Sequence, residues 1–120
     1  MVNTHIIGQT AEDIAVEYLV SQKIKVVDRN YRTRFGEIDI IAKDKKEFIF
    51  VEVKAKNTSR FGKPYEMVTA KKKKKLISTS KRYLMDNGFN LEKDNWRIDV
   101  ISIDYETGKI EWLKNAVEDI

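Results

Sequence analysis

Two neighbouring β-rich segments, residues 36–42 and 48–56, restrict the fold of this chain more than any other feature. The first segment carries two acidic residues, and the second carries one acidic residue and lysine, inside otherwise apolar runs. The short polar connection at residues 44–47 predicts that the two form a β-hairpin. Because buried carboxylates are unfavourable without a partner, this hairpin is a candidate functional site.

The alternation of side chains along a strand predicts which of them share a face. In the first segment Glu37 and Asp39 share one face, and Ile38 and Ile40 share the other. The second segment places its acid and its following lysine on one face in the same way. The polar group of the hairpin is therefore expected to be one-sided.

A symmetrical hairpin would place Asp39 directly opposite Glu52, and Glu37 opposite Lys54. Opposed carboxylates repel each other, so this register favours a bound cation between them. The alternative is a surface hairpin in which Glu37 and Lys54 form a simple cross-strand ion pair.

The residue types indicate which cation would suit the site. The chain has no cysteine and a single histidine, His5, so the ligands on offer are oxygen atoms. Such ligands favour Mg²⁺ or Mn²⁺ over zinc. Lys54 lies two residues from Glu52, where an ammonium could orient a water or stabilise negative charge on a phosphate. This combination is typical of metal-dependent phosphodiester hydrolysis.

An aspartate on one strand followed by Glu-x-Lys on the next resembles the PD-(D/E)XK nuclease superfamily. Asp39, Glu52 and Lys54 occupy the three motif positions, although no proline precedes the aspartate. The chain as a whole is similar to the bacterial YraN family. The matching pieces are Ala11-Glu12 with Ala15 and Tyr18-Leu19, then residues 36–39, 50–54, 61–62, Lys72 and 97–100.

The resemblance implies an α/β fold with a restriction-endonuclease-like core, a mixed β-sheet flanked by α-helices. It also implies that the carbonyl of Val53 joins Asp39 and Glu52 as a metal ligand, and that Glu12 on the first helix approaches the metal. As an acid in the first turn, Glu12 equally fits a plain interaction with the helix dipole. Likeness to junction-resolving enzymes of the superfamily suggests branched DNA and a homodimer.

Helix and strand signals predict the order of the remaining elements. The first element is a helix capped by Thr10 and ending near Gln22, and a short strand at 24–27 and the hairpin follow it. A second helix starts between Pro64 and Thr69 and stops at Asn87-Gly88. A closing hairpin of residues 96–104 and 110–113 completes the order. Arg97 and Asp99 in the closing hairpin are explained by an ion pair inside the sheet.

A run of lysines at residues 71–75 opens the second predicted helix. Such a run is usually a solvated face. The apolar stripe of the helix, extended backwards, reaches Lys72 and Lys73, so part of the run should begin on the inward side. Beside a phosphodiester site, it could instead contact phosphates. The residues expected to contact nucleic acid are Arg34, Lys56, Arg60, Lys63 and Lys72.

The length of 120 residues predicts one domain, residues 1–120. No long apolar run or signal peptide is evident, so the expected location is the cytoplasm without membrane contact. The leading hypothesis is a Mg²⁺- or Mn²⁺-dependent nuclease acting on DNA. The alternative is a non-catalytic nucleic-acid-binding module of the same fold that acts with a partner enzyme.

Overall fold

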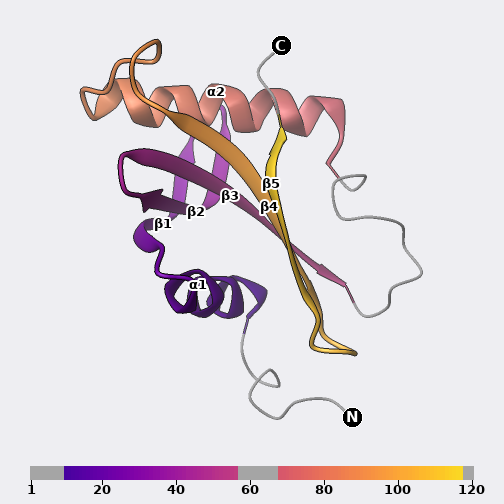
Figure 1. Ribbon diagram of the computed structural model, residues 1–120. Coiled ribbons are helices and arrows are strands. Elements are labelled where there is room, and N and C mark those ends of the chain that lie inside the picture. The colour runs from indigo at the N-terminus through magenta and orange to yellow at the C-terminus, as the bar shows by residue number, and fades with distance from the viewer. Residues whose placement is uncertain (1–9, 57–67, 118–120) are drawn as a thin grey trace.

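A computed structural model describes residues 10–56 and 68–117 and shows a five-stranded sheet with one helix on each face (Figure 1). The strand order is β1-β2-β3-β4-β5; β3 and β4 are parallel, and the other neighbours are antiparallel. This confirms the predicted α/β fold, a mixed sheet flanked by helices. The elements are α1 (Ala11–Ser21), β1 (Lys25–Thr33), β2 (Gly36–Asp44), β3 (Glu47–Lys56), α2 (Ala70–Asp86), β4 (Trp96–Asp104) and β5 (Ile110–Val117).

Both helices begin at a threonine cap, and the cap at Thr10 was predicted. The Thr10 side chain accepts the N–H of Asp13 at 3.1 Å, and the Thr69 side chain accepts the N–H of Lys72 at 3.2 Å. Helix α2 ends just before Asn87, as predicted. Neither helix in the described ranges is long and apolar enough to cross a membrane.

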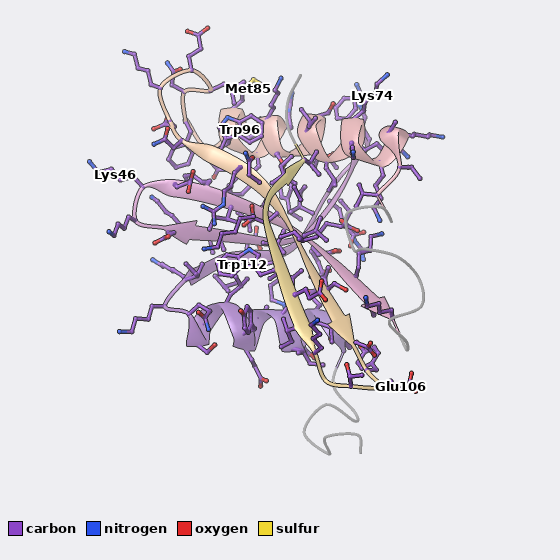
Figure 2. All side chains as sticks on the ribbon, turned by 45° about the vertical axis from the view of Figure 1, so that its right-hand side comes forward. Lys46, Lys74, Met85, Trp96, Glu106 and Trp112 are labelled. Carbon is purple, nitrogen blue, oxygen red and sulfur yellow. The ribbon has the colours of Figure 1, made fainter. Side chains whose placement is uncertain are left out.

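Two strands are longer than the sequence predicts. Strand β1 continues to Thr33 as the antiparallel partner of β2, and β5 continues to Val117 as the partner of β4. In both cases the neighbouring strand supplies backbone hydrogen bonds to polar residues of low β-propensity. Figure 2 marks the two ends of the sheet with Lys46, at the β2–β3 turn, and Glu106, at the β4–β5 turn.

The core has two layers, one on each face of the sheet. Ile14, Ala15 and Leu19 of α1 pack on one face. Leu76 and Leu84 of α2 pack on the other. Each helix therefore has a fixed position over the sheet, and the side chains at its N-terminus are held near particular strands.

Gly36 at the start of β2 allows α2 to lie close to the sheet. A Cβ at this position would be 2.9 Å from Oγ1 of Thr79 and 3.3 Å from Cβ of Lys75. The side chain of Thr79 is itself fully buried. This close approach places the N-terminal half of α2, including Lys72, above β2 and β3.

Asp99 of β4 is a fully buried charge that holds the edge strand β5 in place. Its carboxylate accepts Nε of Arg97 at 3.1 Å, Nε1 of Trp112 at 2.8 Å and the backbone N–H of Asn115 at 2.7 Å. Arg97 also contacts Glu47 of β3 at 2.6 Å. Trp112 lies on the α1 side of the sheet (Figure 2). The predicted ion pair inside the sheet is confirmed, and the network explains Asp99 without a catalytic role.

Candidate active site

The candidate site lies where the ladder between β2 and β3 ends. The two strands pair in the predicted register as far as Ile40 and Val51. Beyond this pair, Oδ2 of Asp39 accepts the backbone N–H of Val53 at 2.8 Å. The carboxylate of Asp39 thus takes the position of a backbone acceptor, which fixes this side chain at the junction of the two strands.

The regular alternation of β2 also breaks at Asp39. Ile38 packs in the core layer under α2, whereas Ile40 packs in the layer under α1. The prediction that these two isoleucines share a face was therefore wrong. Asp39 lines a cavity together with Lys72, Lys75 and Leu76, so its carboxylate lies on the face covered by α2.

Glu37 and Lys54 do not face each other as predicted, because the described ladder ends before it reaches them. Glu37 lies opposite Arg32 of β1, and Oε2 of Glu37 is 3.2 Å from Nε of Arg32. Nζ of Lys54 is instead 3.6 Å from Oε1 of Glu52 on its own strand. The simple cross-strand ion pair of the alternative interpretation is thus not formed.

A cavity of about 310 Å³ opens at this junction. Residues of β2, β3 and α2 line it together: Gly36, Glu37, Asp39, Glu52, Lys72, Lys75 and Leu76. The two predicted metal-binding carboxylates and Glu37 therefore face the same space as the lysine-rich turn of α2. The site is built from β2, β3 and the N-terminal half of α2, which are separated in the sequence.

Asp39 has an unusually high pKa for an aspartate. Burial and the negative charge of Glu52 together raise the pKa of Asp39 from 3.8 to about 6, and burial is the larger of the two causes. The hydrogen bond from Val53 opposes the shift, and Glu12 and Glu37 add to it. Perturbed carboxyl groups in a cavity are a common mark of functional sites. The ionised pair at Asp39 and Glu52 is thus unfavourable without a compensating cation.

Glu52 is buried, and one of its carboxylate oxygens contacts two ammonium groups. Oε1 is 2.6 Å from Nζ of Lys72 and 3.6 Å from Nζ of Lys54. Burial lowers the pKa of Lys54, and the nearby charge of Lys72 lowers it further. For Lys72, burial alone would lower the pKa, but the bond to Glu52 outweighs it and the pKa is raised. Lys72 is therefore held firmly in its charged form.

Glu12, at the start of α1, approaches from the other face of the sheet. Its Oε1 accepts Nε of Arg29 at 3.0 Å and Nδ2 of Asn30 at 2.9 Å. Its charge is near enough to contribute to the raised pKa of Asp39. However, the described residues contain no group of three or more acidic, histidine or cysteine side chains placed to hold a metal. Glu12 is instead bound by Arg29 and Asn30, two residues of β1.

The predicted nucleic-acid contacts are only partly gathered around this cavity. Lys72 lines it, whereas Lys56 borders a separate cavity of about 250 Å³ near the β4–β5 turn. Arg34 lies in the β1–β2 turn, with its guanidinium 5.1 Å from the ring centroid of Phe35. Arg60 and Lys63 lie outside the described residues.

Sequence analysis missed two of the lining residues on α2 and misplaced one. Lys75 and Leu76 follow Lys72 by three and four positions, so the helical stripe could have identified them as lining residues. Lys73, predicted to begin on the inward side, is exposed. The reason is helical phase: one residue turns the side chain by about 100°, which moves position 73 off the stripe that contains 72.

The donor set at the junction fits a small hard cation. Mg²⁺ is commonly bound through one or two carboxylates, with water and substrate phosphate completing the shell. Asp39 and Glu52 supply two carboxylates on one cavity. The single described hydrogen bond from Val53 to Asp39 leaves acceptor sites on that carboxylate, which has about four. Zinc would require nitrogen or sulfur ligands for a typical site, and none is nearby among the described residues.

Comparison with known proteins identifies the group to which the chain is related. The model of "Uncharacterised protein family UPF0102" matches residues 11–103. The chain belongs to this family. A UPF0102 protein of Clostridioides difficile is 43% identical over 109 residues, which cover 91% of this chain and 94% of the relative. One of Aliivibrio fischeri is 40% identical over 110 residues, with 92% and 89% covered. One of Fusobacterium nucleatum is 38% identical over 115 residues, with 96% and 93% covered. Membership confirms the family predicted from the motifs.

Proposed function

We propose that this protein is a nuclease that uses Mg²⁺ or Mn²⁺ to hydrolyse phosphodiester bonds in DNA. The observation that carries the proposal is the convergence of Asp39, Glu52, Lys54 and Lys72 at the point where β2 and β3 separate. Two partly or fully buried carboxylates with two lysines form a site that suits a metal ion and a phosphate together.

The proposed reaction gives roles to the two carboxylates, to Lys54 and to the backbone of Val53. Asp39 and Glu52 would hold the cation, and the carbonyl of Val53 would be a further ligand. Lys54 lies beside Glu52, so its ammonium orients the attacking water or donates to a phosphate oxygen as charge increases there. The hydrogen bond from Val53 holds the Asp39 carboxylate in one orientation before any substrate binds. The bound cation would polarise the phosphate and lower the pKa of water.

Cleavage assays with purified protein test the proposal. Labelled linear duplex, single-stranded and four-way-branched DNA, with a single-stranded RNA for comparison, would be incubated with Mn²⁺ or Mg²⁺. We expect cleavage of at least one DNA and its loss with a chelator and in Glu52→Gln. Glu92→Gln is the matched control, because Glu92 is an exposed acid outside the cavity. Equal cleavage by Glu52→Gln and the parent protein would contradict the assignment.

A binding module with the same outline is the second candidate. One observation favours it: the ammonium of Lys72 already neutralises Glu52 at 2.6 Å. This candidate predicts DNA binding that weakens steeply with salt, and no turnover with either ion. Salt-sensitive binding by the parent protein without cleavage of any of the tested substrates would favour it. The search would then turn to a partner enzyme.

A further inference from the structure

Lys72 differs from Lys54 in how firmly the fold holds it beside Glu52. The side chain of Lys54 is 17% exposed and lies on the same strand as Glu52. The side chain of Lys72 comes from the first turn of α2 and is 41% exposed, although its ammonium makes the shorter contact, 2.6 Å. Lys72 can therefore leave Glu52 by rotation of its own side chain, without movement of the backbone.

The surroundings offer Lys72 a second position. Besides the cavity that contains Asp39 and Glu52, it lines a neighbouring cavity of about 320 Å³. That cavity is otherwise bordered by Thr69, Lys71 and Lys75. Lys72 thus stands between a carboxylate site and a basic surface.

We propose that Lys72 is an exchangeable counter-ion: its ammonium pairs with the carboxylate of Glu52 until a divalent cation binds there in its place. Glu52 is buried, so its charge requires compensation at all times. The ammonium of Lys72 provides it when no metal is bound. The inference rests on the proposed function, because it assumes that Asp39 and Glu52 are the metal ligands.

Two consequences follow from this exchange. The cation and the Lys72 ammonium compete for the same oxygen, so the ammonium lowers the affinity of the unliganded protein for metal. A nucleic acid whose phosphates attract Lys72 away from Glu52 will then raise the affinity for metal. By linkage, metal will raise the affinity for nucleic acid by the same factor. Metal and substrate would thus bind together in preference to either alone.

Direct measurement of Mn²⁺ binding tests this without any activity assay. Binding to the parent protein, Lys72→Met and Lys71→Met would be measured by titration calorimetry at pH 7.5 without nucleic acid. We expect Lys72→Met to bind Mn²⁺ about tenfold more tightly than the parent protein, an effect of the size that coupling between two binding events typically has. Lys71→Met should bind like the parent protein, since Lys71 is exposed and no described ion pair joins it to Glu52. Circular dichroism would establish that all variants are folded.

The results separate failure of this inference from failure of the proposed function. If the parent protein and Lys72→Met bind Mn²⁺ equally, and Glu52→Gln abolishes binding, the metal site stands and the counter-ion role is wrong. If neither protein binds Mn²⁺, or if Glu52→Gln binds as well as the parent, both ideas fail. Tighter binding by Lys72→Met that Glu52→Gln abolishes in the double variant would establish the exchange.

Discussion

Replacing Asp39 by asparagine should make the protein more stable at neutral pH without metal. Burial and the charge of Glu52 raise the pKa of Asp39 to about 6, so the ionised form is disfavoured in the folded protein. The difference between 3.8 and about 6 corresponds to about 3 kcal/mol. Since the side chain keeps some access to solvent, we expect a gain of about 1–2 kcal/mol. Asparagine has the same shape, and its carbonyl oxygen can accept the N–H of Val53.

The pH dependence of the gain follows from the direction of the shift. A carboxyl group whose pKa is higher in the folded state binds its proton more tightly there. Its contribution to stability is complete below about 3.8 and disappears as the pH rises through about 6. The advantage of Asp39→Asn over the parent protein should therefore be absent near pH 4, increase up to pH 6 and remain constant above pH 7.

Urea unfolding monitored by tryptophan fluorescence, with a chelator present, provides the measurement at each pH. Glu92→Gln, which removes an exposed negative charge, controls for the change in net charge. The reasoning is refuted if Asp39→Asn is less stable than the parent protein at pH 7.5. That result would mean that the ionised carboxylate stabilises the fold through its bond to Val53 more than burial and Glu52 destabilise it.

Three further substitutions test the supports of the site, each by urea unfolding. Gly36→Ala should lower the free energy of unfolding by about 1–3 kcal/mol, because the Cβ of the alanine would lie 2.9 Å from Oγ1 of Thr79 and force α2 away from β2. Unchanged stability would mean that α2 is not closely packed against β2 at this position. Asp99→Ala should lower the free energy of unfolding by about 3–5 kcal/mol, because it removes the buried acceptor shared by Arg97, Trp112 and Asn115. A loss below about 1 kcal/mol would exclude this role. Thr10→Ala should lower the free energy of unfolding by about 1 kcal/mol, because it removes the helix cap. Unchanged stability would show that the first turn of α1 is already frayed in the parent protein.

The sequence predicted the hairpin register and the helix ends because both depend on local rules. A short polar turn and alternating side chains were enough to align β2 with β3 as far as Ile40 and Val51. Thr10 and Thr69 cap their helices through bonds to residues three positions along the chain. Such features do not require knowledge of distant segments.

The features that were missed depend on contacts between strands and layers. Alternation within β2 does not reveal that Glu37 would form its ion pair with Arg32 of β1. Nor does it show that the Asp39 side chain would accept the backbone N–H of Val53, or that Ile38 and Ile40 would pack on opposite faces of the sheet. The contact between Lys72 and Glu52 joins α2 to β3, and the two residues are 20 positions apart in the sequence. Only the three-dimensional packing of α2 on the sheet brings them together.

The parallel pairing of β3 and β4 has a consequence for the order in which the protein folds. Strands β1, β2 and β3 follow one another as antiparallel neighbours, so their contacts are local in sequence and we expect them to form early. Pairing of β4 with β3 must await closure of the long crossover that contains α2. Asp39 and Glu52 therefore meet before Lys72 arrives to balance their charge. Docking of α2 is thus both a late folding step and the step that completes the site.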